Sequence, residues 1–225
     1  MWRGQADIQW PVHSAAYRRL AKDSRVPKDQ DLISYEKRLL RRATHRGYRI
    51  FEGRELSDFE LLARLQHHGA ATRLLDATRS SLVGLFFACE RLPTKTGVLL
   101  GFHAYTMGGY EGQPLEKAYD AVVEALPKYE HPQTWEPSNV SPRIAAQHSQ
   151  LLYSAVSPDP RGSLWIGDDK KYPLVAVAIS PAMKRICLKT LSESFDIREL
   201  TLFPDLYGFA ASNDVLHGEY DDARW

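Results

Sequence analysis

Polar side chains are unusually dense in residues 66–76, which read QHHGAATRLLD. His67 and His68 supply acid–base capacity near neutral pH. The guanidinium of Arg73 suits an anionic oxygen, and the carboxylate of Asp76 suits a ribose hydroxyl or a histidine. Functional sites need such groups on rigid elements, and apolar stretches flank the segment on both sides. Residues 66–76 are therefore the predicted functional centre.

A purely structural interpretation of the same residues stays open. His67 and His68 would suit the C-terminus of a helix, where imidazolium interacts well with the helix dipole, and Arg73 and Asp76 could pair with each other. The two interpretations predict different geometries. The functional one requires Arg3, His67, Arg73 and Asp76 to converge on one cleft. The structural one buries Arg73 against Asp76, far from Arg3.

A second polar cluster opens the chain beside two tryptophans, Trp2 and Trp10. Its members are Arg3, Gly4, Gln5 and Asp7. An arginine next to a glycine lets side chain and backbone approach a phosphate or carboxylate, although an exposed terminal strand would have the same composition. Because this motif begins with no element before it, an additional N-terminal element is expected.

A third candidate segment is residues 141–152, SPRIAAQHSQLL, which follows a loop rich in proline and aromatic residues. On a helix, Arg143 and Gln147 would lie one turn apart on the same face. The alternative for this segment is an ordinary surface turn that leads into a strand.

Several classes of site are excluded by spacing. Adjacent histidines on a helix point about 100° apart, unlike the i, i+4 pair of a zinc helix, so no metal is expected at His67, His68 and Asp76. The chain contains neither a G-x-S-x-G elbow nor a GxxxxGK[ST] loop. Cys89 and Cys187 lack CxxC spacing and are interpreted as buried free thiols, which favours a reducing compartment.

Composition bounds the class of protein. The chain has 225 residues, of which 44% are hydrophobic and 25% charged, so one globular domain over residues 1–225 is expected. The net charge of +1 gives no global field, so any contact with nucleic acid must be local. No apolar run approaches the roughly 20 residues of a membrane span, and a cytoplasmic protein without membrane contact is predicted.

The residues that precede the polar segment 66–76 carry the patterns of two helices. Residues 31–46 should form an amphipathic helix with a basic outer face, because apolar residues recur near helical spacing at Leu32, Tyr35, Leu39, Leu40 and Ala43. Ser57 and Glu60 form a capping box at the start of the next helix, and Gly69 stops it. The last turn of that helix should therefore carry Gln66, His67 and His68.

Residues 70–76 have the length of a short buried strand that ends at Asp76. A helix over 82–90 follows, with three candidate N-cap residues, Thr78, Ser80 and Ser81.

Further along the chain, strands are predicted at 97–105, 174–179 and 200–208. The strand at 174–179 should be central in the sheet, and the one at 200–208 should end at a proline turn. Helices are predicted at 114–126 and 181–193. Helices and strands that do not strictly alternate indicate an α+β fold, with mixed central β-structure flanked by helices.

Taken together, the motifs resemble the FRG domain, a bacterial and phage family with a Phe/Tyr-Arg-Gly signature. The signature corresponds to WRGQ at 2–5, and the central motif to QHHG at 66–69 with TRLLDAT at 72–78 and FFA at 86–88. Supporting similarities are RIAAQ at 143–147 and LFPDLYG at 202–208. Two positions depart from the pattern: Trp2 replaces Phe or Tyr, and Ser81 replaces a proline.

A more distant similarity points to ADP-ribosyltransferases, whose first strand carries an Arg-Gly pair that grips NAD. Arg3 and Gly4 resemble that pair, and residues 74–88 resemble the later strand and helix of those enzymes. Their glutamate has no obvious counterpart, and Gln147 lies about where it is expected. This similarity implies an ADP-ribosyltransferase-like fold and NAD as substrate.

The hypothesis is that ADP-ribose passes from NAD to a macromolecule, with nucleic acid as a candidate acceptor, in a toxin or anti-phage system that would include an antitoxin. His67 or His68 would act as base, Asp76 would stabilise oxocarbenium character, and Gln147 would contact acceptor or ribose. The residues assigned to NAD binding are Arg3, Gln5, Gln66, Thr72, Arg73, Thr78 and Arg143. Two rivals stay open: a metal-independent nuclease or hydrolase, and a non-catalytic sensor of nucleotide or nucleic acid.

Overall fold

The computed structural model describes residues 1–22, 26–103, 118–129, 131–138, 141–165 and 174–213, and its α+β architecture confirms the predicted fold class. A six-stranded antiparallel sheet with the order β6-β7-β4-β1-β5-β8 forms the centre. Its strands are β1 (Trp2–Gln5), β4 (Leu75–Thr78), β5 (Gly97–Phe102), β6 (Gln133–Trp135), β7 (Ser149–Tyr153) and β8 (Leu174–Ile179). A separate hairpin joins β2 (Ile50–Phe51) to β3 (Arg54–Glu55).

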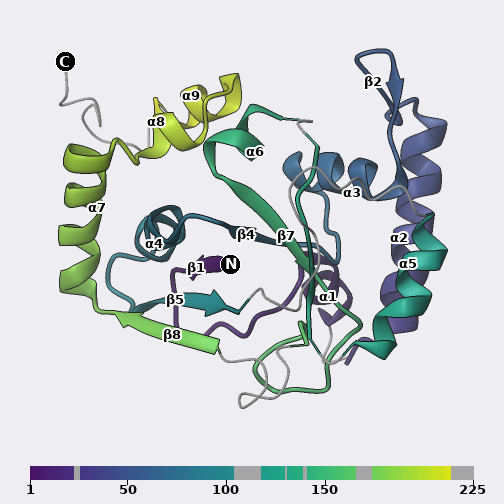
Figure 1. Cartoon of the computed structure of the whole chain (residues 1–225), viewed down its shortest axis with the longest axis horizontal. Helices are drawn as coiled ribbons and strands as arrows, with labels where there is room; N and C mark the ends of the chain where they lie inside the picture. Colours follow the sequence, from purple (N-terminus) through teal and green to yellow (C-terminus); the bar gives the residue numbers. More distant parts are fainter. Residues whose placement is uncertain (23–25, 104–117, 130, 139–140, 166–173, 214–225) are drawn as a thin grey trace.

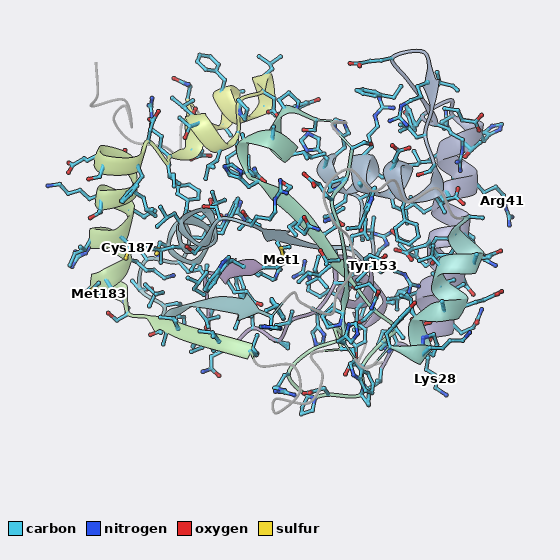
Figure 2. All side chains as sticks on the ribbon, in the orientation of Figure 1. Met1, Lys28, Arg41, Tyr153, Met183 and Cys187 are labelled. Carbon is cyan, nitrogen blue, oxygen red and sulfur yellow. The ribbon has the colours of Figure 1, made fainter. Side chains whose placement is uncertain are left out.

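Helices cover the sheet from two sides (Figure 1). On one side are α2 (Asp29–His45) and α5 (Tyr119–Ala125), and on the other is α7 (Pro181–Phe195), with α4 (Ser81–Cys89) between α7 and the sheet. The same two ends of the molecule are marked in Figure 2 by Lys28 and Arg41 near α2, and by Met183 and Cys187 on α7. The remaining helical elements are α1 (Ala15–Leu20), α3 (Asp58–His67), η2 (Leu126–Lys128), α6 (Pro142–Ala146), α8 (Glu199–Leu202) and α9 (Leu206–Ser212).

Each side of the sheet has its own apolar core. Around α2, α3 and α5, the fully buried Phe59 packs against the rings of Tyr119, Trp135 and Tyr153, with centroid distances of 6.1, 6.2 and 5.3 Å. Around α4 and α7, buried Val83 and Phe86 pack with Leu191. The two halves of the sheet are thus held by different sets of helices.

The capping box at the start of α3 is confirmed. Ser57 Oγ accepts from the Glu60 N–H, and the Glu60 carboxylate accepts from the Ser57 N–H at 2.8 Å. The helix ends before Gly69, whose φ of +85° suits glycine. Gln66 and His67 lie in the last turn, and His68 is the C-cap residue.

The strand predicted at 70–76 begins later, at Leu75, and ends at Thr78. The residues just before β4 form their backbone hydrogen bonds with groups outside the sheet. The Thr72 carbonyl accepts from the Ala16 N–H, and the Arg73 N–H donates to the Glu36 carboxylate. Asp76 is therefore the second residue of the strand and not its last.

The strand at 174–179 is confirmed, but its central position is wrong. β8 is an edge strand that pairs with β5, and among the described residues it has no second strand neighbour. Val175 and Val177 are accordingly 52% and 43% exposed. A short β-branched run is typical of central strands, yet composition cannot tell an edge from a centre when exposed apolar residues are tolerated.

The strand predicted at 200–208 is also wrong, because this stretch forms α8 and α9. The Thr201 hydroxyl accepts from the Arg198 N–H at the start of α8. Asp205 caps α9 by accepting from the Gly208 N–H at 2.9 Å, and Pro204 separates the two helices. Local capping chemistry outweighs the apolar run that favours a strand.

The boundaries of several other helices and strands agree closely with those predicted from the sequence. The helices predicted at 31–46 and 181–193 correspond to α2 and α7, and Pro181 opens α7. Ser80 caps α4, whereas Thr78 belongs to β4. β5 ends at Phe102, and α5 begins at Tyr119; the predictions for residues 104–105 and 114–117 lie outside the described residues. Among the described helices, none is long and apolar enough to cross a membrane.

Candidate functional site

A cleft opens inside the sheet between β1 and β4. The two strands are paired at one position, Trp2 with Thr78, whereas β1 pairs with β5 along its whole length. A cavity of about 410 Å³ lies along the unpaired part, a volume in the range of small-molecule sites. Its lining includes eleven polar or charged side chains, namely Arg3, Gln5, Arg18, Gln66, His67, Asp76, Thr78, Glu90, Arg91, Arg143 and Gln147.

Gly4 allows a helix to press directly on β1. A Cβ at this position would lie 2.1 Å from the Gly84 carbonyl oxygen and 2.4 Å from the Ala88 N atom, both in α4. The glycine of the Arg-Gly pair therefore serves helix packing, in addition to lining the cavity. Because α4 lies so close, Phe87 and Glu90 at its end also line the cavity.

Arg3 bridges the two separated strands. Its Nη1 donates to the Asp76 carbonyl oxygen at 2.5 Å, in a place where an antiparallel ladder would otherwise supply a backbone donor. Burial lowers the pKa of Arg3, and Arg18 lowers it further, whereas Asp76 raises it. The Nε atom of Arg3 is buried and has no hydrogen-bond partner among the described residues. Arg3 thus lines the cavity with one donor unsatisfied.

Asp76 is exposed in the cavity and held by a hydrogen-bond relay. Gln66 Nε2 donates to Asp76 Oδ1 at 2.6 Å, and Thr72 Oγ1 donates in turn to Gln66 Oε1. The Thr72 hydroxyl also accepts from the Leu74 N–H at 3.2 Å. Gln66 and Thr72 were both predicted to bind NAD. Thr72 is fully buried and outside the cavity lining, so its role is to orient Gln66 and, through it, Asp76.

His67 lines the cavity, whereas His68 is exposed and does not. A ring nitrogen of His67 lies 3.3 Å from Ser141 Oγ, and His67 Nε2 lies 3.8 Å from Asp205 Oδ2. Burial lowers the pKa of His67, and the nearby Arg143 lowers it further. The neutral imidazole is therefore favoured at pH 7, and His67 is the better placed of the two histidines to accept a proton.

Arg143 and Gln147 reach the cavity as predicted, from α6 and its C-cap. Arg143 binds Asp205 through two hydrogen bonds of 2.5 and 2.7 Å, which lower the pKa of Asp205 to about 2. Its guanidinium also lies 4.9 Å from the centre of the Phe203 ring. The Gln147 carbonyl accepts from Thr78 Oγ1 at 2.7 Å, and its side chain donates to the Leu202 carbonyl. Both residues therefore connect the sheet to α8 and α9.

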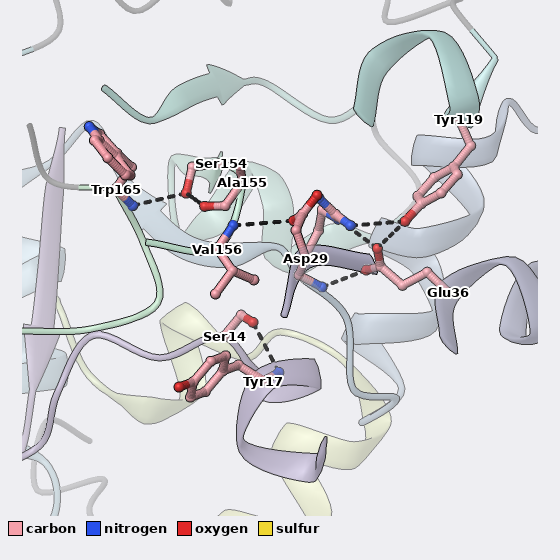
Figure 3. Close-up of polar contacts among 10 residues, drawn as sticks. Ser14, Tyr17, Asp29, Glu36, Tyr119, Ser154, Ala155, Val156 and Trp165 are labelled. Carbon is pink, nitrogen blue, oxygen red and sulfur yellow. Dashed lines mark hydrogen bonds and ion pairs between the residues drawn. The ribbon is translucent and has the colours of Figure 1, made fainter. Parts of the chain in front are cut away.

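Arg73 does not reach the cleft, contrary to the prediction. It is 2% exposed and binds Glu36 through Nε at 2.6 Å and the Tyr119 hydroxyl at 3.1 Å. Figure 3 shows the side chains of Asp29, Glu36 and Tyr119 pointing toward one another at this network. Burial alone would lower the pKa of Arg73, but Glu36, Tyr119 and Asp29 reverse the shift and raise it. The network is structural, although its acidic partner is Glu36 and not Asp76.

Several further lining residues carried no assigned role in the sequence, among them the aromatic residues Trp10, Phe87 and Phe203 and the charged residues Arg18, Glu90 and Arg91. Glu90 is notable because burial and the nearby Glu199 raise its pKa, partly offset by Arg91. Its position one residue after an apolar helix gave no signal, since charged residues are common there. Phe203 was assigned to a strand that the structure replaces with α8.

The described residues contain no group of three His, Cys, Asp or Glu side chains arranged to hold a metal. Cys89 is buried and Cys187 is partly buried, and both are free thiols. Burial raises the pKa of Cys89 to about 12, with a further contribution from Cys187. Neither cysteine lines the cavity.

The family model of the FRG domain matches residues 1–96. This match supports the resemblance to the FRG domain family over residues 1–96. The match contains β1, α3, β4 and α4, and with them the two strands that border the cleft. The similarities noted at 143–147 and 202–208 lie beyond the matched residues. Searches of curated proteins and of solved structures gave no match.

Proposed function

We propose that this protein transfers ADP-ribose from NAD to a macromolecular acceptor. The supporting observation is the cleft between β1 and β4, which brings Arg3 and Asp76 together although 73 positions separate them. A partly buried cation, an exposed carboxylate and a neutral imidazole share this one cavity. Those three groups match the anionic pyrophosphate, the developing sugar cation and the acceptor proton of such a reaction.

In this reaction the bond between the ribose C1″ atom and the nicotinamide nitrogen breaks, and nicotinamide leaves with the bonding electron pair. A nucleophilic oxygen or nitrogen of the acceptor then forms a bond to C1″. The acceptor proton passes to His67, whose lowered pKa leaves it neutral near pH 7. Asp76 stabilises the positive charge that develops on the sugar, while Arg3 holds the pyrophosphate.

The geometry changes the roles assigned from the sequence. Arg73 lies outside the cavity, whereas Arg143 lines it together with Arg18 and Arg91, and Arg143 is paired with Asp205. Thr78 is 3% exposed and donates its hydroxyl proton to Gln147, so its role is to position the cavity wall. Gln147 is likewise held by Leu202. Of the residues assigned from the sequence, Arg3, Gln5, His67 and Asp76 are the cavity-lining groups that we assign to contacts with a ligand.

The proposed context follows from the family resemblance. Transfer to nucleic acid in a toxin or anti-phage system would take place in the cytoplasm and would require an antitoxin or immunity partner. Two other functions use the same cavity: hydrolysis of nucleic acid by His67 without metal, and binding of a nucleotide without turnover. Both leave the nicotinamide bond of NAD intact, which separates them from the proposed reaction.

Incubation with NAD labelled in the adenylate phosphate tests the proposal. DNA, RNA and bacterial protein are offered as acceptors, and nicotinamide release is followed in parallel. We expect label transfer to one acceptor class with equal release of nicotinamide. Asp76→Asn should lower the rate by roughly a hundredfold, because the charge that stabilises the transition state is lost.

Asp120→Asn is the matched control. Asp120 is an exposed carboxylate on α5 that pairs with Lys37 and lies outside the cavity lining, so its loss should leave the rate unchanged. Absence of both label transfer and nicotinamide release with every acceptor would refute the proposal. Equal rates for wild-type protein and Asp76→Asn would refute the role of Asp76.

A further inference from the structure

Gln5 has a buried acceptor that no protein group satisfies. The side chain is 6% exposed and lines the cavity. Its Nε2 donates to the Trp10 carbonyl oxygen at 2.8 Å, which fixes the orientation of the amide. Oε1 is consequently the free atom, and it is buried with no hydrogen-bond partner among the described residues.

Such atoms are rare in this protein and concentrate at the cleft. Within the described ranges, the buried side-chain N and O atoms without a partner are Arg3 Nε, Gln5 Oε1 and Trp135 Nε1. Arg3 and Gln5 both line the cavity. Burying a donor or an acceptor without a partner is unfavourable, so two unsatisfied groups at one cavity indicate that a ligand satisfies them.

The spacing of the two groups defines what that ligand carries. Arg3 and Gln5 are two residues apart on β1, so their side chains point to the same face of the strand, and their Cα atoms are roughly 6.6 Å apart. One group is a cationic donor and the other a neutral acceptor. Trp10, which is 48% exposed and lines the same cavity, offers a flat apolar surface next to Gln5. An anionic oxygen and an amine-bearing planar ring fit this arrangement.

We infer that Gln5 Oε1 accepts a hydrogen bond from an –NH₂ group on a planar ring of the ligand, whose phosphate Arg3 holds. This inference rests on the proposed function and makes Gln5 a specificity-determining residue for NAD. The dinucleotide carries two such groups, the carboxamide of nicotinamide and the exocyclic amine of adenine. A buried acceptor discriminates strongly against ligands without the donor, because it stays unpaired when they bind.

Two analogues with the same net charge as NAD separate the two sources of the amine. In 3-acetylpyridine adenine dinucleotide a methyl group replaces the carboxamide –NH₂, and in nicotinamide hypoxanthine dinucleotide an oxygen replaces the adenine amine. Dissociation constants are measured by calorimetry for NAD and both analogues. We expect the wild-type protein to bind one analogue roughly tenfold more weakly than NAD. The analogue that loses affinity identifies the ring that Gln5 contacts.

Gln5→Met tests whether Gln5 causes the preference. The methionine keeps the length of the side chain but removes the amide, so the variant should bind NAD and the sensitive analogue with equal affinity. The matched control is Gln9→Met, because Gln9 is exposed and lies outside the cavity lining, and it should keep the tenfold ratio. The melting temperature of each variant without ligand, followed by circular dichroism, gives the folding control.

The outcomes separate this inference from the proposed function. If both analogues bind the wild-type protein as tightly as NAD, the inference about Gln5 fails and the proposed reaction stands. A tenfold ratio that persists in Gln5→Met also overturns it. If no dinucleotide binds at all, the proposed function itself fails.

Discussion

Removing the Arg73 guanidinium should destabilise the protein strongly without changing ligand binding at the cleft. Arg73 is 2% exposed, and its main partner, Glu36, is fully buried. Arg73→Met leaves the Glu36 carboxylate without its cation in a site that keeps the Tyr119 hydroxyl as a donor, at 2.6 Å. Removing one partner of a buried ion pair lowers the free energy of unfolding by about 3–5 kcal/mol. For a chain of this length that corresponds to a fall in Tm of roughly 6–20 °C.

The double variant Arg73→Met/Glu36→Leu should regain much of that loss, because a buried ion pair can be replaced by apolar residues at little net cost. Arg54→Ala is the control: the Arg54 side chain is 52% exposed and pairs with Glu60, so its removal should cost less than about 1 kcal/mol. Thermal unfolding followed by circular dichroism gives the stabilities, and calorimetry gives NAD affinity at a temperature where each variant is folded. A folded Arg73→Met variant with wild-type stability and no NAD binding would refute the structural role of Arg73.

Two further predictions concern pH dependence and packing. Burial lowers the pKa of His67 below its ordinary 6.5, so the transfer rate should fall with decreasing pH only below pH 6.5. His67→Gln should abolish this fall in rate at low pH. A midpoint above pH 7 would contradict the assignment of His67 as base. Gly4→Ala should cost about 3 kcal/mol or more in urea unfolding, because its Cβ meets α4 backbone atoms. Gly69→Ala should cost only about 1–2 kcal/mol, because its site is open and only the positive φ is strained; equal costs would contradict the close packing of β1 on α4.

Local signals in the sequence predicted the elements that carry the site. The capping box of Ser57 and Glu60 located α3, and Ser80 located α4, because both motifs act within four residues. The helix end at Gly69 followed from the same kind of local chemistry. These signals were sufficient to place Gln66 and His67 in a last turn beside a strand that carries Asp76.

The roles of Arg73 and Asp205 depend on contacts between residues far apart in the chain, which the sequence does not reveal. Arg73 lies in the densest polar segment of the chain, yet its partners Glu36 and Tyr119 are 37 and 46 positions away. Nothing near Arg73 in the sequence distinguishes a buried ion pair from a ligand-binding arginine. The same limit applies to Asp205, which the apolar run at 200–208 concealed and which Arg143 binds across 62 positions.

The cleft itself follows from how the two halves of the sheet are anchored. β1 pairs fully with β5, and Gly4 brings it into backbone contact with α4. β4 pairs fully with β7, and the residues just before it are bonded to α1 and α2 through Thr72 and Arg73. Each strand is thus fixed to a different set of helices, and the two share one paired position, Trp2 with Thr78. The structural network around Arg73 therefore stabilises the half of the sheet to which β4 belongs, while the pairing of β4 with β7 holds Asp76 in place when that network is removed.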